Sequence, residues 1–238
     1  MRKRILLAMC CMLVLSTSCA VGSRKQVTAT RDVSGFDQVV FEGLGEMTIR
    51  QGDSEALTIM AESNVMKRIT SVVRGDALHI GYRSSVFGLN VVPTMPIRYD
   101  LTVRDIRGLD LTGLGSIDVG EIAADSLSVD LSGVGRVVIR ALSADRLNVN
   151  LSGLGSCDVS GQVGRQELLL TGGGDYDAAD LKSERAALTL TGLGKATVWA
   201  TEDLDVTITG AGDVEYYGSP RVTQDVTGLG RVRSLRER

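Results

Sequence analysis

The chain has 238 residues, of which 43% are hydrophobic and 23% charged, and its formal net charge is -3. This length and hydrophobic content suffice for one sizeable core and argue against a disordered chain. Acidic residues outnumber basic ones by 29 to 26, which is not the composition of a nucleic-acid-binding surface, so no nucleic acid partner is expected.

The N-terminus predicts an export signal. Arg2, Lys3 and Arg4 precede an unbroken apolar run over residues 5–15. This run is too short to cross a bilayer but is typical of a signal peptide. Residues 1–18 are therefore expected to be removed, leaving 23 basic against 29 acidic residues, a net charge of about -6.

The next stretch, "LSTSCAVGS", resembles a bacterial lipoprotein signal, which implies that Cys19 is lipidated and anchors the protein to a membrane. The aliphatic residue usual three places before the cysteine is Ser16 here, with Leu15 one place further back. An ordinary signal cut near Ala20 is the alternative. Residues 19–29 are expected to form a tether.

Residues 30–110 predict an irregular N-terminal β region. The segments "FDQVVFEGLGEMTIRQG", "ALTIMAES" and "ALHIGYR" have the composition of strands. Residues 64–73 form a short helix or a further strand, and residues 86–96, with Pro93 and Pro96, form a loop. We expect this region to cover one open end of the repeats that follow, because an uncovered strand edge invites pairing with other chains.

Residues 111–238 consist of repeats, and together with residues 30–110 they are expected to form one continuous domain. The first copy is "LTGLGSIDV", and successive copies start 20, 20, 19, 20, 18 and 18 residues apart, at Leu111, Leu131, Leu151, Leu170, Leu190, Ile208 and Val226. An eighth copy, "FEGLGEMTI", stands far upstream at Phe41. Such a period identifies a repeat architecture.

Each copy carries two segments of alternating apolar and polar residues, which is the pattern of half-buried strands. The copies are too short for propeller blades, and no helical period separates them. The fold class predicted is therefore all-β, a parallel β-helix with rungs of 18–20 residues. The rungs stack about 4.8 Å apart.

The glycine pair within each copy is expected to mark a corner of the coil. Glycine there would supply either a positive φ or room for neighbouring backbones to approach. Parity places the first residue of each copy on one inward column and a second set on another, namely Ile117, Val137, Cys157, Tyr176, Ala196 and Val214. The residue between the glycines has no direction assigned by parity. Cys157 is interpreted as a buried filler.

Here the chain resembles the putative auto-transporter adhesin family with a head GIN domain. The resemblance rests on the lipoprotein-type signal, the "FEGLGEMTIRQG" opening, the "VRGDALHIGYR" stretch and the serial "L-[ST]-G-x-G" repeats, and covers roughly residues 30 to 235. It implies a right-handed β-helix and a place in the cell envelope. It implies no reaction and no particular binding residue.

Catalytic and metal-binding residues are sparse. His79 is the only histidine and lies within an alternating strand, so it is interpreted as structural. The glycine pairs are followed by strands, which excludes a dinucleotide-binding loop. A calcium site from Asp175, Asp177 and Asp213 is an alternative to solvated carboxylates. No metal or cofactor is expected.

A polysaccharide-acting enzyme is the main catalytic alternative, since such sites use paired carboxylates. Asp118 and Asp158 share a repeat register two rungs apart, or roughly 9.6 Å. That separation is near the upper end of the range for inverting enzymes. The short rungs leave little chain for a cleft.

Trp199 and Tyr217 are the predicted binding residues. Both follow the inward residue of the second strand, as Gly120, Arg140 and Ser160 do in earlier repeats, with Leu235 next. We expect the two rings to be stacked outward on adjacent rungs, where they would bind a sugar or a protein partner. Packing over the corner is the alternative.

The sequence thus predicts a non-enzymatic lipoprotein of the bacterial envelope, in the outer membrane, that binds a glycan or protein. Self-association through an end rung is a third possibility, although arginines at positions 231, 233, 236 and 238 would discourage pairing there by their charge.

Overall fold

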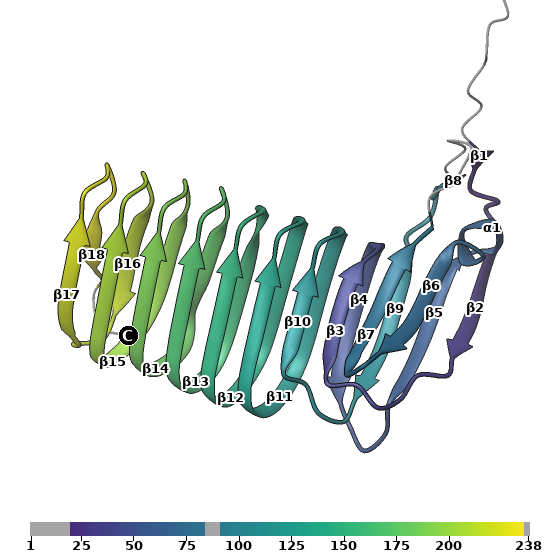
Figure 1. Cartoon of the computed structure of the whole chain (residues 1–238), viewed down its shortest axis with the longest axis horizontal. Helices are drawn as coiled ribbons and strands as arrows, with labels where there is room; N and C mark the ends of the chain where they lie inside the picture. The colour runs from purple at the N-terminus through teal and green to yellow at the C-terminus, as the bar shows by residue number, and fades with distance from the viewer. Residues whose placement is uncertain (1–19, 84–90, 236–238) are drawn as a thin grey trace, which may run out of the picture.

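The computed structural model describes residues 20–83 and 91–235. Strands make up 71% of the structure and helix 2%, and the strands stack as parallel coils in a β-solenoid of about 6 turns, as predicted. In Figure 1 the near strands rise and the chain returns behind them as it advances toward the C-terminus, which is a right-handed coil.

The strands and one short helix follow the chain in this order: β1 (Ala20–Val21), β2 (Gln26–Arg31), β3 (Gln38–Glu42), β4 (Leu44–Gln51), β5 (Ala56–Glu62), α1 (Ser63–Met66), β6 (Ile69–Arg74), β7 (Ala77–Tyr82), β8 (Val91–Val92), β9 (Arg98–Val103), β10 (Gly108–Leu111), β11 (Leu114–Leu131), β12 (Val134–Leu151), β13 (Leu154–Leu170), β14 (Asp175–Leu190), β15 (Lys195–Ile208), β16 (Asp213–Tyr217), β17 (Arg221–Val226) and β18 (Val232–Ser234).

Each rung has two faces joined by two edges. The tip edge, at the top of Figure 1, consists of the Ser/Thr-Gly-x-Gly tetrads such as residues 112–115. The base edge, at the bottom, is a bend through which the long strands continue, as β11 does around residues 120–126. One strand therefore supplies both a first face, such as residues 116–119, and a second face, such as residues 127–131.

The tip glycines are required by close approach of neighbouring rungs. A Cβ atom added to Gly133 would overlap the carbonyl oxygen of Gly113, and one added to Gly153 would overlap that of Gly133. Of the tip glycines only Gly45, in the upstream copy, has a positive φ, +121°. The second of the two predicted reasons therefore applies in the repeats: the backbones touch where a side chain would stand.

The two inward columns form the core between the faces. Leu111, Ile117 and Cys157 are 0% exposed, and Tyr176 is 2% exposed. Val226 is an exception at 38% exposure, because it belongs to the final rung and no further rung of the described chain covers it. The buried-filler interpretation of Cys157 is confirmed, and burial raises the pKa of its thiol.

Differences in rung length are absorbed at the base edge. Between β12 and β13 the register shifts after Ile139, and between β13 and β14 it shifts after Asp158. Between β14 and β15 it shifts after Ala178 and again after Ser183. The tips stay aligned throughout, so a shortened rung changes which base residues lie side by side.

The upstream copy is the direct neighbour of the first repeat, although 70 residues separate them in sequence. Phe41 pairs with Leu111, and Leu44 pairs with Leu114, in parallel register. Strands β3 and β4 thus form a rung that continues the stack. Parallel pairing extends one rung further, to β7 and β9.

Antiparallel strands then end the stack on this side. β5 pairs with β9, β2 with β5, and β6 with β7. Residues 64–73 supply both predicted alternatives, since α1 ends at Met66 and β6 begins at Ile69. Part of the segment expected to be a tether is strand, because β1 pairs with β8 and β2 begins at Gln26.

Glu62 fastens the N-terminal segment to this cap. Its side chain is 1% exposed and accepts hydrogen bonds from the Arg24 amide at 2.7 Å and the Thr94 amide at 2.7 Å. The Thr94 hydroxyl donates a third bond at 2.6 Å, and the Met95 amide a fourth at 3.3 Å. These bonds, led by the Thr94 hydroxyl, lower the pKa of Glu62 to about 2.

Gly133→Ala should lower the free energy of unfolding by about 3 kcal/mol, because the added methyl group forces the tips of two rungs apart. Urea denaturation measures this change. Gly120→Ala is the control: a Cβ there meets only the Ile49 carbonyl oxygen at 3.7 Å, an ordinary contact. Equal destabilisation by the two variants would contradict the close-approach explanation.

Glu62→Gln should destabilise the protein in a pH-dependent way. The pKa of Glu62 is about 2 when folded against an ordinary 4.5, so its stabilisation is complete above about pH 4.5 and is lost as the pH falls from there toward 2. The difference in urea midpoint between wild type and Glu62→Gln should therefore shrink below about pH 4.5. The exposed Glu121→Gln serves as control, and a difference independent of pH would refute this role.

Candidate functional site

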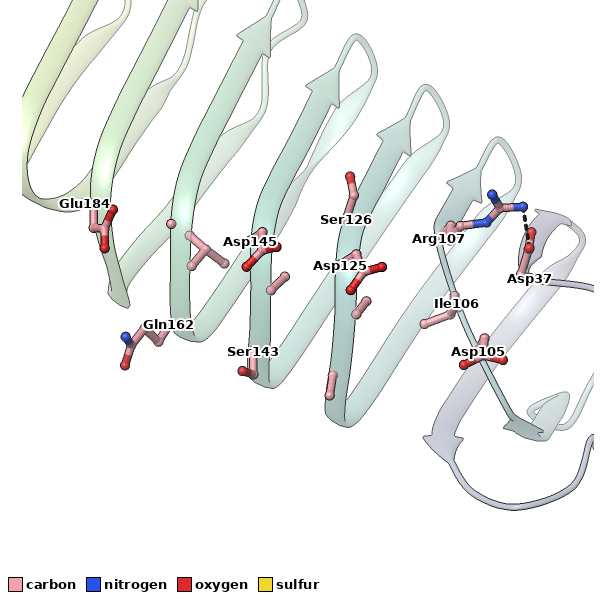
Figure 2. A pocket seen from close by; sticks show the side chains of 15 residues that line it. Asp37, Asp105, Ile106, Arg107, Asp125, Ser126, Ser143, Asp145, Gln162 and Glu184 are labelled. Atoms are coloured by element: carbon pink, nitrogen blue, oxygen red, sulfur yellow. Dashed lines mark ion pairs between the residues drawn. The ribbon is translucent and has the colours of Figure 1, made fainter.

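A groove of about 850 Å³ runs along the base edge and crosses several rungs (Figure 2). Its walls carry five carboxylates, from Asp37, Asp105, Asp125, Asp145 and Glu184. Arg107 is the one basic residue among them, so the lining carries a formal charge of 1 - 5 = -4. Small and uncharged side chains such as Ser126, Ser143 and Gln162 complete the groove.

The repeat itself places these carboxylates. Ala124 pairs with Ala144 and Ser126 with Arg146, which sets Asp125 and Asp145 one rung apart. Gly164 and Glu184 follow in the same column. The column is therefore acidic at three of these four positions, and Gly164 interrupts it.

Arg107 lies at one end of the groove (Figure 2). It forms an ion pair with Asp37, drawn as the dashed line in Figure 2, and its Nη2 lies 3.7 Å from Asp76 Oδ2. Both acids that this arginine contacts lie on the two rungs upstream of the repeats. The remaining carboxylates create a negative field that favours neutral or positively charged ligands over anions.

Trp199 and Tyr217 lie side by side on adjacent rungs, and both are partly exposed. Leu235 comes next, since its amide donates to the Tyr216 carbonyl at 2.8 Å. The predicted column upstream of them was wrong, however. Base-edge register shifts place Trp199 opposite Lys182, and not in line with Gly120, Arg140 and Ser160.

The corrected column joins the aromatic pair to the groove. Lys182 pairs with Gln162, Gln162 with Ser143, and Ser143 with Ala123. The last three all line the groove. The rings of Trp199 and Tyr217 thus continue the same row of base-edge positions toward the C-terminus.

A buried polar chain inside the solenoid holds the backbone at Trp199. The Tyr176 hydroxyl donates to Gln166 Oε1 at 3.0 Å, and Gln166 Nε2 donates to Ser183 Oγ at 2.8 Å. Ser183 Oγ then donates to the Trp199 carbonyl oxygen at 2.8 Å. Gln166 and Ser183 are 2% and 1% exposed. Sequence reasoning missed both, although their polar side chains at apolar positions were a signal.

The carboxylates considered for catalysis are each held by an arginine. Asp118 accepts from Arg140 Nε at 2.9 Å, and Asp158 from Arg136 Nε at 2.6 Å. Val138 lies between the two acids in register, as expected. Each of the two carboxylates therefore already has an arginine as its hydrogen-bond partner.

The acids considered for calcium make other bonds. Asp175 Oδ1 accepts from the Lys195 amide and Asp213 Oδ1 from the Arg231 amide, each at 3.0 Å, while Asp177 Oδ1 accepts from the Ala179 amide at 3.1 Å. Within residues 20–83 and 91–235, no group of three or more potential ligands is placed to hold a metal ion.

His79 lies in β7 opposite Val40, on the second face and away from the groove. Cys19, the predicted lipidation site, lies outside the described residues. In the part of the chain that the structure describes, no helix has the length and apolar character needed to span a membrane.

Residues 35–220 match a family model described as "Putative auto-transporter adhesin, head GIN domain". A comparison with curated proteins gives no match.

Solved structures share the fold. The chain is similar to a putative adhesin from Bacteroides fragilis NCTC 9343, with a TM-score of 0.86 and 24% identity over 90% of this chain and 99% of that chain. A putative adhesin from Parabacteroides distasonis ATCC 8503 gives 0.72 and 19% over 91% and 99%. A protein from the same species described as a putative lipid binding protein gives 0.72 and 21% over 90% and 98%.

Proposed function

Because the chain belongs to the family described as putative auto-transporter adhesins with a head GIN domain, we propose that it is a non-catalytic binding module of the bacterial envelope. It is exported, anchored in the outer membrane by acyl chains on Cys19, and recognises a neutral glycan along its base edge. The family description and the names of the structural neighbours support an exported adhesin-like protein.

The observation that carries this proposal is the continuity of the groove with the aromatic pair. Carboxylate, amide and hydroxyl groups in the groove supply hydrogen-bond partners for sugar hydroxyls. The rings of Trp199 and Tyr217 supply apolar faces on which pyranose rings stack. A linear polymer lying along the base edge would meet both.

The charge of the groove narrows the ligand class. Its lining carries a formal charge of -4, which disfavours acidic polysaccharides. A basic protein segment would also be attracted by this charge but would not need the aromatic rings. A neutral glycan uses the carboxylates as hydrogen-bond acceptors and the rings as stacking faces.

Self-association is a second candidate, supported by the C-terminal end of the stack. β17 and β18 have no neighbour on their outer side within the described chain, and such edges can pair with another chain. Arg233 there is engaged by Glu215 on the preceding rung, so its charge is partly compensated.

Trp199→Ala combined with Tyr217→Ala should weaken glycan binding about tenfold or more, because both stacking faces are lost. Glycan arrays followed by titration calorimetry on the array hit measure this effect. Thr189→Ala combined with Thr207→Ala is the matched control, since these residues also pair on adjacent rungs but lie on the second face. Array binding that survives the aromatic double variant unchanged would refute the assignment, and capture of basic peptides alone would identify a protein ligand.

Cys19→Ala should move the protein from the membrane fraction to the soluble fraction of expressing cells, because the acyl chains that anchor it attach to Cys19 and several are needed for stable anchoring. Cys11→Ala, within the predicted signal, is the control and should leave the partition unchanged. Immunoblots of fractionated cells give the readout. A Cys19→Ala protein that stays with the membranes would exclude the lipid anchor.

A further inference from the structure

Exposed large apolar side chains gather on the tip edge. They occupy the position between the two tip glycines, whose direction the sequence left undecided, and the structure points this column outward. We call these residues the tip ridge: Leu114 is 56% exposed, Val134 51%, Leu154 63%, Leu193 69% and Leu229 87%.

Backbone contact at the tips leaves this side chain no inward direction. The glycines on both sides of Val134 contact carbonyl oxygens of the preceding rung, and the amide of Val134 donates to the Gly113 carbonyl oxygen at 3.2 Å. The inward columns on each face already fill the core up to the tip. The ridge residue therefore projects into solvent on five of the seven repeats, and the same position holds Gly173 and Ala211 on the other two.

The tetrads of the seven later copies also lack charge, whereas the upstream copy has Glu42 at the corresponding place. The tetrads at residues 112–115, 132–135, 152–155, 171–174 and 191–194 contain only Ser, Thr, Gly, Leu and Val, and the last two add only Ala. The base edge, by contrast, carries the acidic column of the groove. The solenoid is thus amphipathic from edge to edge, with its apolar ridge about 29 Å long from Leu114 to Leu229 at 4.8 Å a rung.

The N-terminal end of the described chain lies on the same side of the molecule as the ridge. β2 starts with Gln26, which lies opposite Glu62 at the end of β5. β9 starts just after Ile97, and Ile97 lies against the tip glycine Gly45. The segments before β2 and β9 therefore extend from the tip side. Figure 1 shows β1 and β8, formed from them, beyond the tip loops.

These two short strands add to the apolar surface. Val21 in β1 is 61% exposed and Val92 in β8 is 50% exposed. β1 begins one residue after Cys19, and the clasp at Glu62 fixes this segment to the cap. A lipid chain on Cys19 would therefore leave the protein on the ridge side.

We propose that the tip edge lies on a lipid bilayer, with the tip ridge, Val21 and Val92 inserted at the boundary between headgroups and acyl chains. Five large apolar side chains in one uncharged row can lie along a flat membrane, and interfacial binding grows with buried apolar area. The proposal rests on the lipid anchor at Cys19, because that anchor brings this edge to the membrane. The base-edge groove then faces away from the bilayer.

Fluorescence quenching by brominated lipids tests this orientation. Trp199→Phe removes the single tryptophan, and Leu154→Trp or Ser143→Trp is then added to the full lipidated protein. Leu154 belongs to the tip ridge and Ser143 to the base edge, and both residues are exposed. Each protein is reconstituted into phosphatidylethanolamine and phosphatidylglycerol vesicles with or without bromine on the acyl chains.

Brominated lipid should reduce the Leu154→Trp fluorescence by at least about half and leave Ser143→Trp within about a tenth of its unquenched value. Equal quenching at the two sites, or none at Leu154→Trp, overturns the proposal. Circular dichroism verifies that both variants keep the strand content of the parent.

A second comparison separates this proposal from the proposed function. If Cys19→Ala is released from the membrane but Leu154→Trp is not quenched, the lipid anchor is supported and the tip-edge contact is refuted. Quenching at Leu154→Trp together with no glycan binding by the wild-type protein, which keeps Trp199, would support the tip-edge contact and refute the glycan-binding role. If the Leu154→Trp fluorescence is unaffected by brominated lipid and changes only when an envelope protein is added, the bilayer is refuted as the partner of the tip edge.

Discussion

Contact between the backbones of neighbouring rungs at the tip is the constraint on which the structure depends. The carbonyl oxygen of one tip glycine occupies the place that the Cβ of the next would need, as for Gly113 and Gly133. A side chain at either glycine position would open the stack, and the parallel ladder would lose its hydrogen bonds there. The tips are thereby held in one register along the repeats, and variation in rung length is confined to the base.

This constraint makes the two edges chemically different. At the tip, the glycines turn one side chain per rung outward, and most of these are Leu or Val. At the base, bends of variable length accommodate Asp125, Asp145 and Glu184, whose carboxylates line a groove. A constant geometry along the tip edge and a variable one along the base edge fit the proposals that the tip edge lies on the membrane and the base edge binds a ligand.

Much of the fold could be predicted from the sequence because repeats and alternation are local. The spacing of Leu111, Leu131 and Leu151 predicts rungs, and parity predicts their burial. Contacts between segments that lie far apart in the sequence could not be predicted. The pairing of Phe41 with Leu111 and the clasp between Glu62 and Thr94 join segments that no period connects. The column containing Trp199 was misassigned because an 18-residue rung does not reveal where its missing residues fall, whereas the structure places them at the base.

Lipid photocrosslinking of the unaltered, lipidated protein tests the division between the edges most directly. Vesicles containing a phospholipid with a diazirine on its acyl chain are irradiated, and the modified peptides are mapped by mass spectrometry. Adducts are expected at the tip tetrads, such as residues 152–155 and 191–194, and at residues 91–92, with none at the base bends around residues 123–126 and 143–146. Adducts concentrated at the base, or spread evenly over both edges, would contradict this division.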